Sequence, residues 1–146
     1  FKVMPVLRRE SDRLALWEGL KDGTIDTIVS DHRPHDKEEK DVEFDNASFG
    51  CINLQTVISA LSECKEFDLS VVIKALSINA REISSITEHP IEVGNKADLT
   101  VYAPDNQWTL TKDLICSQTI NTPYVGKDLK GSVLGIINNG KLAIRD

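Results

Sequence analysis

A short run of β-branched residues, Thr-Ile-Asp-Thr-Ile-Val at positions 24–29, limits the fold of this chain more than any other segment. Its length and composition are typical of a strand that is buried on both faces, as in parallel sheets. The residues before it predict an amphipathic helix, because Ser11 can cap it, apolar side chains follow at near-helical spacing, and Gly23 can end it. A helix that leads directly into a buried strand indicates an α/β unit.

The rest of the chain divides into a helical part and a β part. The polar, acidic residues 33–46 predict a long loop. Apolar side chains at helical spacing then predict three helices, at 51–63, at 70–76 and from Asn79 onward. From about residue 90 strand signals dominate, in candidate strands at 99–102, 107–110, 133–137 and 141–144, of which the last two flank a hairpin signal, Asn138-Asn139-Gly140. We therefore expect an α/β unit over residues 1–89 and a separate β subdomain over residues 90–146.

The composition favours a soluble globular protein of the cytoplasm. Of the 146 residues, 40% are hydrophobic and 27% are charged, and no apolar run approaches the roughly 20 residues that a membrane-spanning helix needs. The net charge of −6 and the scattered basic residues disfavour a nucleic-acid surface. The three cysteines, Cys51, Cys64 and Cys116, lack Cys-x-x-Cys spacing, so we expect reduced, structural thiols rather than a zinc or redox motif.

The segment Ser30-Asp31-His32-Arg33-Pro34-His35 directly follows the predicted strand and is the candidate for chemistry. Catalytic groups collect at the carboxyl ends of strands in barrels and α/β sheets, because the loops there converge on one crevice. A carboxylate at that point can bind a divalent metal or accept a proton from a water that the metal has acidified. Aspartate is also common wherever a strand turns into a loop, so Asp31 by itself leaves a catalytic and a turn-capping role equally open. Pro34 opposes a helix that would present His32 and His35 to one metal.

The chain resembles the class I dihydroorotases of the amidohydrolase superfamily at several motifs that occur in the right order. The matching segments are Lys2-Val3-Met4-Pro5-Val6-Leu7-Arg8, Asp22-Gly23-Thr24-Ile25-Asp26, Ser30-Asp31-His32-Arg33-Pro34-His35, Gly94-Asn95-Lys96-Ala97-Asp98-Leu99 and Asn121-Thr122-Pro123-Tyr124-Val125-Gly126. The family patterns are approximately K-V-N-P-P-L-R, D-G-T-I-D, T-D-H-A-P-H, G-x-x-A-D-L and N-T-P-F-x-G. The resemblance implies that residues 25–30 are the eighth strand of a (β/α)8 barrel of the TIM type. It also implies that residues 90–146 belong to the small β-sandwich of such enzymes.

The same resemblance implies roles for individual residues. Asp31 matches the aspartate that ligates one zinc and carries the proton between the attacking hydroxide and the ring nitrogen. His35 matches the histidine that holds the substrate carboxylate, Phe49 and Gly50 match the loop whose backbone contacts the pyrimidine ring, and His32 is expected to support the loop. The implied reaction is the zinc-dependent, reversible hydrolysis of dihydroorotate to N-carbamoyl-L-aspartate in pyrimidine biosynthesis. The implied zinc site is binuclear, and its other ligands belong to sequence before Phe1.

Two departures from the family pattern matter most. Met4 stands where the family usually has an Asn that hydrogen-bonds the substrate, and a thioether cannot donate a hydrogen bond. Met4 either fills a gap at the barrel rim or marks a change of specificity or activity. Val6 replaces the second proline of the pattern.

The departure at Met4 keeps two alternatives to a dihydroorotase open. One is a catalytically inactive, dihydroorotase-like chain that serves as a structural partner of aspartate transcarbamoylase. The other is a different cyclic amidohydrolase, such as a hydantoinase or an allantoinase. The resemblance also implies a homodimer.

Overall fold

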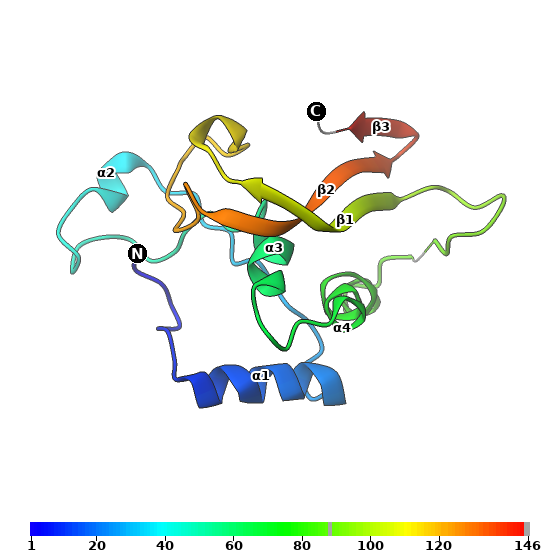
Figure 1. The fold of residues 1–146 in the computed structure, drawn as a ribbon, viewed down its shortest axis with the longest axis horizontal. Helices are drawn as coiled ribbons and strands as arrows, with labels where there is room; N and C mark the ends of the chain where they lie inside the picture. Colours follow the sequence, from blue (N-terminus) through cyan, green and yellow to red (C-terminus); the bar gives the residue numbers. More distant parts are fainter. Residues whose placement is uncertain (88, 145–146) are drawn as a thin grey trace.

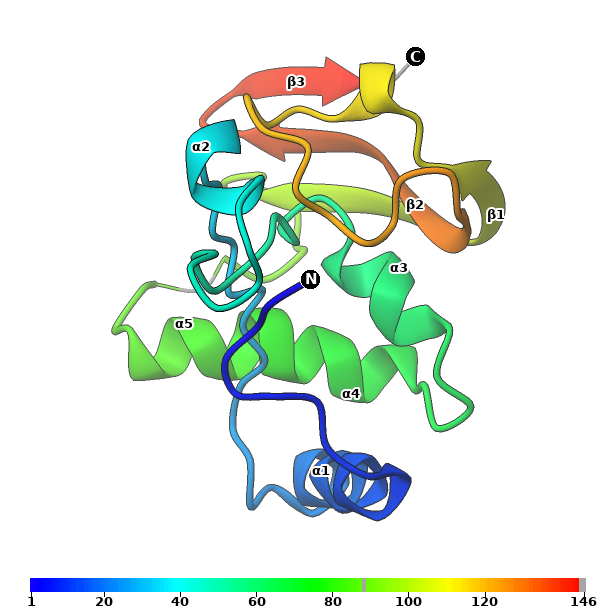
Figure 2. The same ribbon diagram turned by 90° about the vertical axis from the view of Figure 1, so that its left-hand side faces the viewer.

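The computed structural model describes residues 1–87 and 89–144. The helices are α1 (Glu10–Asp22), α2 (Lys37–Lys40), α3 (Val57–Ser62), α4 (Leu69–Ile73) and α5 (Asn79–Ile83), with a π-helical turn η1 (Lys74–Ile78) and a 3₁₀ turn η2 (Lys112–Leu114). The strands are β1 (Leu99–Thr109), β2 (Asp128–Asn138) and β3 (Lys141–Ile144). The sheet lies on one side of the molecule, α3 to α5 lie beneath it, and α1 lies farthest from the sheet (Figure 1, Figure 2). None of the helices in the described ranges is long and apolar enough to cross a membrane.

Helix α1 confirms the helix predicted around Ser11, but its N-cap is different. Arg9 is the N-cap residue, and its backbone N–H donates a hydrogen bond of 3.2 Å to the carboxylate of Asp12. Gly23 ends the helix in the left-handed conformation with φ of 84°, as predicted. Of the apolar residues at helical spacing, Trp17 is buried, Leu20 is partly buried and Leu14 is 38% exposed, so the predicted inner face is confirmed only at its centre.

Residues 24 and 25 form a bend, and residues 26–29 belong to no helix or strand in the described part of the chain. Val29 is 77% exposed, so the prediction of a strand buried on both faces is wrong for this chain alone. A parallel strand exists only where neighbouring strands complete its hydrogen bonds. Here the segment is held by helical residues instead: the Ile28 N–H donates to the Ala75 carbonyl at 3.3 Å, and Asn79 Nδ2 donates to the Asp26 carbonyl at 2.8 Å.

Residues 69–83 form one continuous helical stretch, not the two helices predicted. The helix α4 starts at Asp68 rather than Ser70, because the Asp68 carboxylate accepts hydrogen bonds from the backbone N–H groups of Ser70 and Val71. The π-helical turn η1 then joins α4 to α5 without a break. Asn79 therefore does not cap a new helix, and its side chain donates a hydrogen bond to the Asp26 carbonyl instead.

Helix α3 is shorter than the predicted helix over 51–63. Its first half is replaced by bonds to distant segments, because the Ile52 N–H donates to the Asn121 carbonyl at 3.1 Å and Cys51 forms a parallel bridge with His32. Helix α2 lies inside the predicted loop 33–46 and gives that loop one helical turn. As a result, α2 follows closely after residues 31–35 in the chain, and Cys51 pairs with His32 within that segment.

The sheet is antiparallel with the order β1-β2-β3. Strand β1 joins the two predicted strands at 99–102 and 107–110 into one, with irregular register between them. The predicted hairpin is confirmed, since Asn139 and Gly140 both have positive φ, 49° and 72°, as a type I′ turn requires. Helix α3 packs against β2, where Ser59 Oγ donates to the Gly131 carbonyl at 2.6 Å. This contact joins the sheet to the layer that carries residues 51–62.

Candidate active site

Asp31 follows the irregular segment 24–30 and has an unusual backbone conformation. Its φ is 43°, in the left-handed region that a non-glycine residue adopts at some cost in energy. Arg33 Nε donates to Asp31 Oδ1 at 2.8 Å, and the Asp31 side chain is 46% exposed. Aspartate adopts this conformation more readily than most residues, so the backbone geometry at Asp31 fits a functional role and turn capping equally.

Arg33 stands where the family pattern has Ala, and its backbone is fixed on both sides. Its N–H donates to the Cys51 carbonyl at 2.9 Å, and its carbonyl accepts from Asn121 Nδ2 at 3.2 Å. The backbone from which the Arg33 side chain extends toward Asp31 is therefore held in place on both sides. Any ligand of that carboxylate has to share it with Arg33 or displace Arg33.

His32 turns toward the backbone that precedes α3. Its Nδ1 atom accepts hydrogen bonds from the N–H groups of Asn53 and Leu54, both at 3.2 Å. His32 therefore holds the backbone of residues 53–54, while its expected support of the loop at residues 49–50 stays a prediction. Since Nδ1 is occupied as an acceptor, the proton of a neutral imidazole lies on Nε2.

His35 is held between two oxygen atoms. Its Nδ1 lies 2.9 Å from Glu39 Oε2, and its Nε2 lies 2.9 Å from the Phe49 carbonyl oxygen. Both partners are acceptors, so the arrangement is fully satisfied only when both ring nitrogens carry protons and the imidazole is cationic. The hydrogen bond from His35 lowers the pKa of the Glu39 carboxyl, which keeps the carboxylate charged beside the ring. A cationic ring suits the binding of a carboxylate, although such a ligand has to share a ring N–H with one of these oxygens.

Gly50 occupies a position that a larger residue cannot fill. Its φ is 117°, and a Cβ atom there would lie 2.6 Å from the Cβ of Arg33. The Gly50 N–H donates to the Lys2 carbonyl at 2.8 Å, and Lys2 Nζ lies 4.5 Å from the centroid of the Phe49 ring. The start of the chain, the segment 31–35 and the backbone of residues 49–50 therefore meet at one place.

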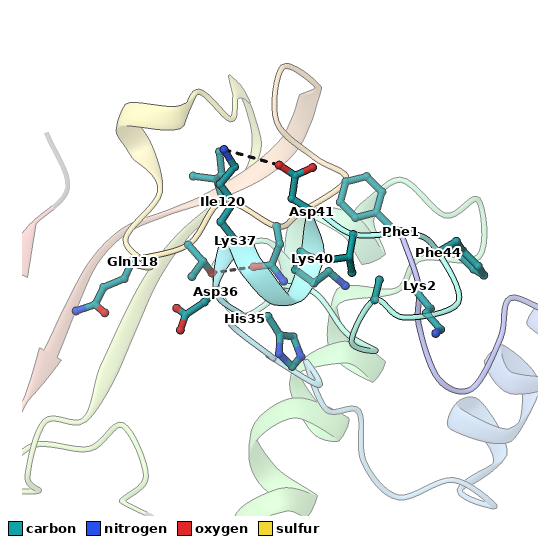
Figure 3. A pocket seen from close by; sticks show the side chains of 14 residues that line it. Phe1, Lys2, His35, Asp36, Lys37, Lys40, Asp41, Phe44, Gln118 and Ile120 are labelled. Carbon is teal, nitrogen blue, oxygen red and sulfur yellow. Dashed lines mark hydrogen bonds and ion pairs between the residues drawn. The ribbon is translucent and has the colours of Figure 1, made fainter.

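Two cavities lie next to the place where residues 2, 31–35 and 49–50 meet. The first has a volume of about 730 Å³, and its wall includes His35, Lys40 and Phe44 (Figure 3). The second has a volume of about 530 Å³ and lies beside His32, between residues 52–56 and the sheet. Asp31 lines neither of these two cavities, and Met4 is 55% exposed outside both. The structure thus connects His35 with a cavity and leaves Asp31 at an open surface.

A metal site is not complete in this chain. Within residues 1–87 and 89–144, no three side chains of His, Cys, Asp or Glu gather around a common point. The Asp31 carboxylate has the donor chemistry that zinc accepts and lies at a turn just beyond the segment 24–30, so Asp31 fits as a single ligand. His32 and His35 are both held by other partners, and the Asp31 carboxylate is itself paired with Arg33, so a metal at Asp31 would have to share that carboxylate with Arg33 or displace it.

The sequence did not identify three residues that organise this site. Lys2, Glu39 and Lys40 all contact the backbone or side chains of residues 35–50. Glu39 and Lys40 lie in the acidic segment that was predicted to be a loop, where charges usually face solvent. A signal existed in the spacing, since Glu39 follows His35 by four residues, the separation that brings side chains together across a helical turn.

Comparison with known proteins identifies similar chains. The sequence model of the amidohydrolase family matches residues 3–143. The chain is 42% identical to the dihydroorotase of Chlorobaculum tepidum over 99% of this chain and 34% of that protein, and 39% identical to the dihydroorotase of Clostridium acetobutylicum over 99% of this chain and 35% of that protein. It therefore spans about a third of the length of the curated relatives that it matches.

The fold is similar to those of solved hydantoinases. The D-hydantoinase (dihydropyrimidinase) from Thermus sp. superposes with a TM-score of 0.82 at 26% sequence identity, over 100% of this chain and 34% of that chain. The match confirms the predicted fold class, the C-terminal part of a barrel of the amidohydrolase type followed by β-strands.

Proposed function

Because this chain belongs to the amidohydrolase family, we propose that it forms the C-terminal part of a dihydroorotase, which reversibly hydrolyses dihydroorotate to N-carbamoyl-L-aspartate. The observation that carries the proposal is the meeting of three matched motifs, at residues 2–8, 31–35 and 49–50, at one place in the structure. The chain is 42% identical to a dihydroorotase but only 26% identical to the D-hydantoinase from Thermus sp.. This difference supports dihydroorotate, rather than a hydantoin, as the substrate.

In the proposed reaction Asp31 is the proton carrier. Its carboxylate accepts the proton of the attacking water and delivers it to the ring nitrogen as the amide bond breaks. His35 binds the carboxylate of dihydroorotate through a hydrogen bond from a ring N–H group. The backbone of Phe49 and Gly50 contacts the pyrimidine ring and sets its orientation toward Asp31.

The proposed cofactor is zinc. When bound, zinc polarises the scissile carbonyl and makes water a stronger nucleophile near neutral pH. Asp31 would supply one ligand, and we propose that the other ligands of a binuclear site belong to sequence outside this chain. Arg33 would then leave Asp31 Oδ1, or share it, when the metal is loaded.

Further proposals concern the organisation of the whole protein. Residues 1–89 are proposed as the end of the barrel and residues 90–146 as the C-terminal segment of a β-sandwich subdomain. We also propose a cytoplasmic homodimer that acts in pyrimidine biosynthesis and associates with aspartate transcarbamoylase.

The proposal is tested on the full-length protein that contains this chain. The expected result is about two zinc ions per chain and turnover of dihydroorotate at a rate of at least about 1 s⁻¹. Hydantoin and dihydropyrimidine substrates serve as controls, and we expect much slower turnover of both. Preferred turnover of a hydantoin would contradict the substrate assignment.

A structural role without catalysis is the second candidate, and two observations favour it. Met4 replaces the amide of the family pattern, and Arg33 pairs with the carboxylate that would bind the metal. A full-length protein that binds no zinc and does not turn over dihydroorotate, but co-purifies with aspartate transcarbamoylase, would establish this role in place of the enzyme.

A further inference from the structure

Most polar atoms in the backbone of residues 48–50 form hydrogen bonds with other parts of the chain. The Phe49 carbonyl bonds to His35 Nε2, and the Gly50 N–H donates to the Lys2 carbonyl. The remaining two carbonyls, those of Ser48 and Gly50, both accept hydrogen bonds from one atom, Lys40 Nζ, at 2.6 and 2.9 Å. Lys40 therefore holds the segment on both sides of Phe49.

The environment of Lys40 differs from that of an ordinary surface lysine. Lys40 is the last residue of α2, is half-buried, and lies in the wall of the 730 Å³ cavity together with His35 (Figure 3). An ammonium group that donates to two backbone carbonyls makes charge-assisted bonds, which are stronger than neutral ones and stronger still away from water. Lys37, one turn earlier in α2, is 84% exposed and only approaches Asp41 at 3.7 Å.

Helix α2 and the segment 48–50 form a closed unit through these bonds. The Ser48 N–H donates to the Glu39 carbonyl at 3.0 Å, so the last two residues of α2 hold Ser48 from both its N–H and its carbonyl. Glu39 also holds His35 at 2.9 Å. The position of His35 relative to the Phe49 and Gly50 backbone is thus set through α2.

We propose that Lys40 is a positioning residue, which fixes the Phe49 and Gly50 backbone so that it can receive the pyrimidine ring of the substrate. This inference rests on the proposed function, because it assigns the ring-binding role to that backbone. Lys40 does not touch the reacting atoms in this role. Its loss should weaken substrate binding more than it slows the chemical step.

The test uses the full-length protein with Lys40→Met, which keeps the apolar stem of the side chain and removes the donors. We expect KM for dihydroorotate to rise by about tenfold or more while kcat changes by less than about threefold. Lys37→Met is the matched control on the same helix and should change neither constant by more than about twofold. Lys40→Arg should restore part of the lost affinity, because guanidinium also donates to carbonyls.

Amide hydrogen exchange of the same variants gives a readout that does not need turnover. The Gly50 and Ser48 amides should exchange at least about tenfold faster in Lys40→Met than in wild type or Lys37→Met. Unchanged KM together with unchanged exchange would overturn the role of Lys40, and so would an equal loss in kcat and kcat/KM that Lys40→Arg does not restore. A wild-type protein without turnover refutes the proposed function instead, and the exchange rates then decide whether Lys40 holds this backbone.

Discussion

Asp31 and Gly50 both have positive φ, 43° and 117°, and the Arg33 side chain bonds Asp31 and occupies the space beside Gly50 that an added Cβ would need. Arg33 Nε bonds the Asp31 carboxylate, and the first carbons of the same side chain lie where a Cβ at position 50 would be. The proposed proton carrier and the proposed ring-binding backbone are therefore coupled through one residue. A substitution at position 31 or 50 should therefore shift the Arg33 side chain and alter the conformation at the other position.

Gly50→Ala should be among the most damaging small substitutions in this region. The new methyl group would lie 2.6 and 2.7 Å from Arg33 Cβ and Cδ, and alanine disfavours the observed φ. We expect a loss of about 2–4 kcal/mol in the free energy of unfolding, measured by chemical denaturation of the full-length protein.

Gly94→Ala is the matched control for this change. Gly94 also has positive φ, 95°, but no atom lies within 4 Å of the added Cβ. It should lose only about 1–2 kcal/mol, the cost of the backbone conformation itself. Equal losses in the two variants would show that the Arg33 side chain moves aside freely and does not couple the two sites.

At the scale of the elements, Arg13 bridges α1 to the loop before α4. Arg13 Nη1 donates to Glu66 Oε2 at 2.6 Å, and the same guanidinium bonds Glu10 within α1. The hydrogen bond from Arg13 lowers the pKa of the Glu66 carboxyl. The contact links α1 to the loop before α4, and its strength depends on the charge of Glu66.

Glu66→Gln should lower the Tm of the full-length protein near neutral pH, whereas Glu10→Gln, which breaks only a contact within the helix, should lower it less. A carboxyl group whose pKa is lowered in the folded protein stabilises the fold above its ordinary pKa of 4.5, and this stabilisation is lost as the pH falls through the lowered value. The Tm difference between wild type and Glu66→Gln should therefore shrink from about pH 7 to about pH 3. A difference that stays constant over this range would contradict a role for the charge.

The elements that the sequence predicted well are those with local signals. Helix α1 has its apolar face and its terminal Gly23, and the β2-β3 hairpin has Asn139 and Gly140, so both could be predicted from neighbouring residues alone. Apolar side chains in residues 51–56 have helical spacing too, but the backbone there donates hydrogen bonds to His32 and to the Asn121 carbonyl instead of forming a helix. Such bonds join residues far apart in the sequence, and no local pattern encodes them.

The candidate site was predicted in part for the same reason. Asp31 and His35 lie in a motif that the sequence displays, and the structure brings the 49–50 backbone to His35 through the Phe49 carbonyl. The contributions of Lys2, Glu39 and Lys40 depend on how the segment 36–50 folds back on itself. Sequence charge alone indicates only a polar loop there.

At the scale of the whole molecule, the chain exposes far more surface than its mass requires. The accessible surface is 10345 Å², whereas a compact protein of 16.2 kDa exposes about 7,450 Å², so the excess is roughly 2,900 Å². Much of the exposed area is apolar, as at Leu7, Val29, Ile91, Leu142 and Ile144. We expect the full-length protein to cover this surface with neighbouring barrel strands and sandwich strands.

Residues 1–146 produced alone should therefore bind a hydrophobic dye such as anilinonaphthalene sulfonate and self-associate, because large exposed apolar patches drive both. The full-length protein should bind little dye and should unfold cooperatively. Dye fluorescence and sedimentation of the two proteins at equal concentration make the comparison. A monomeric, dye-free chain that unfolds sharply would show that residues 1–146 form an independent domain.

Turnover of dihydroorotate by the full-length Asp31→Asn variant tests the central proposal most directly. Asparagine keeps the size and the turn conformation of Asp31 but cannot carry the proton, so turnover should fall by about 10²–10⁴-fold while Tm stays at the wild-type value. Asp41→Asn, an exposed aspartate 74% accessible at the end of α2, should keep full turnover. An Asp31→Asn protein that retains more than about a tenth of wild-type turnover would contradict the assignment of Asp31 as the proton carrier.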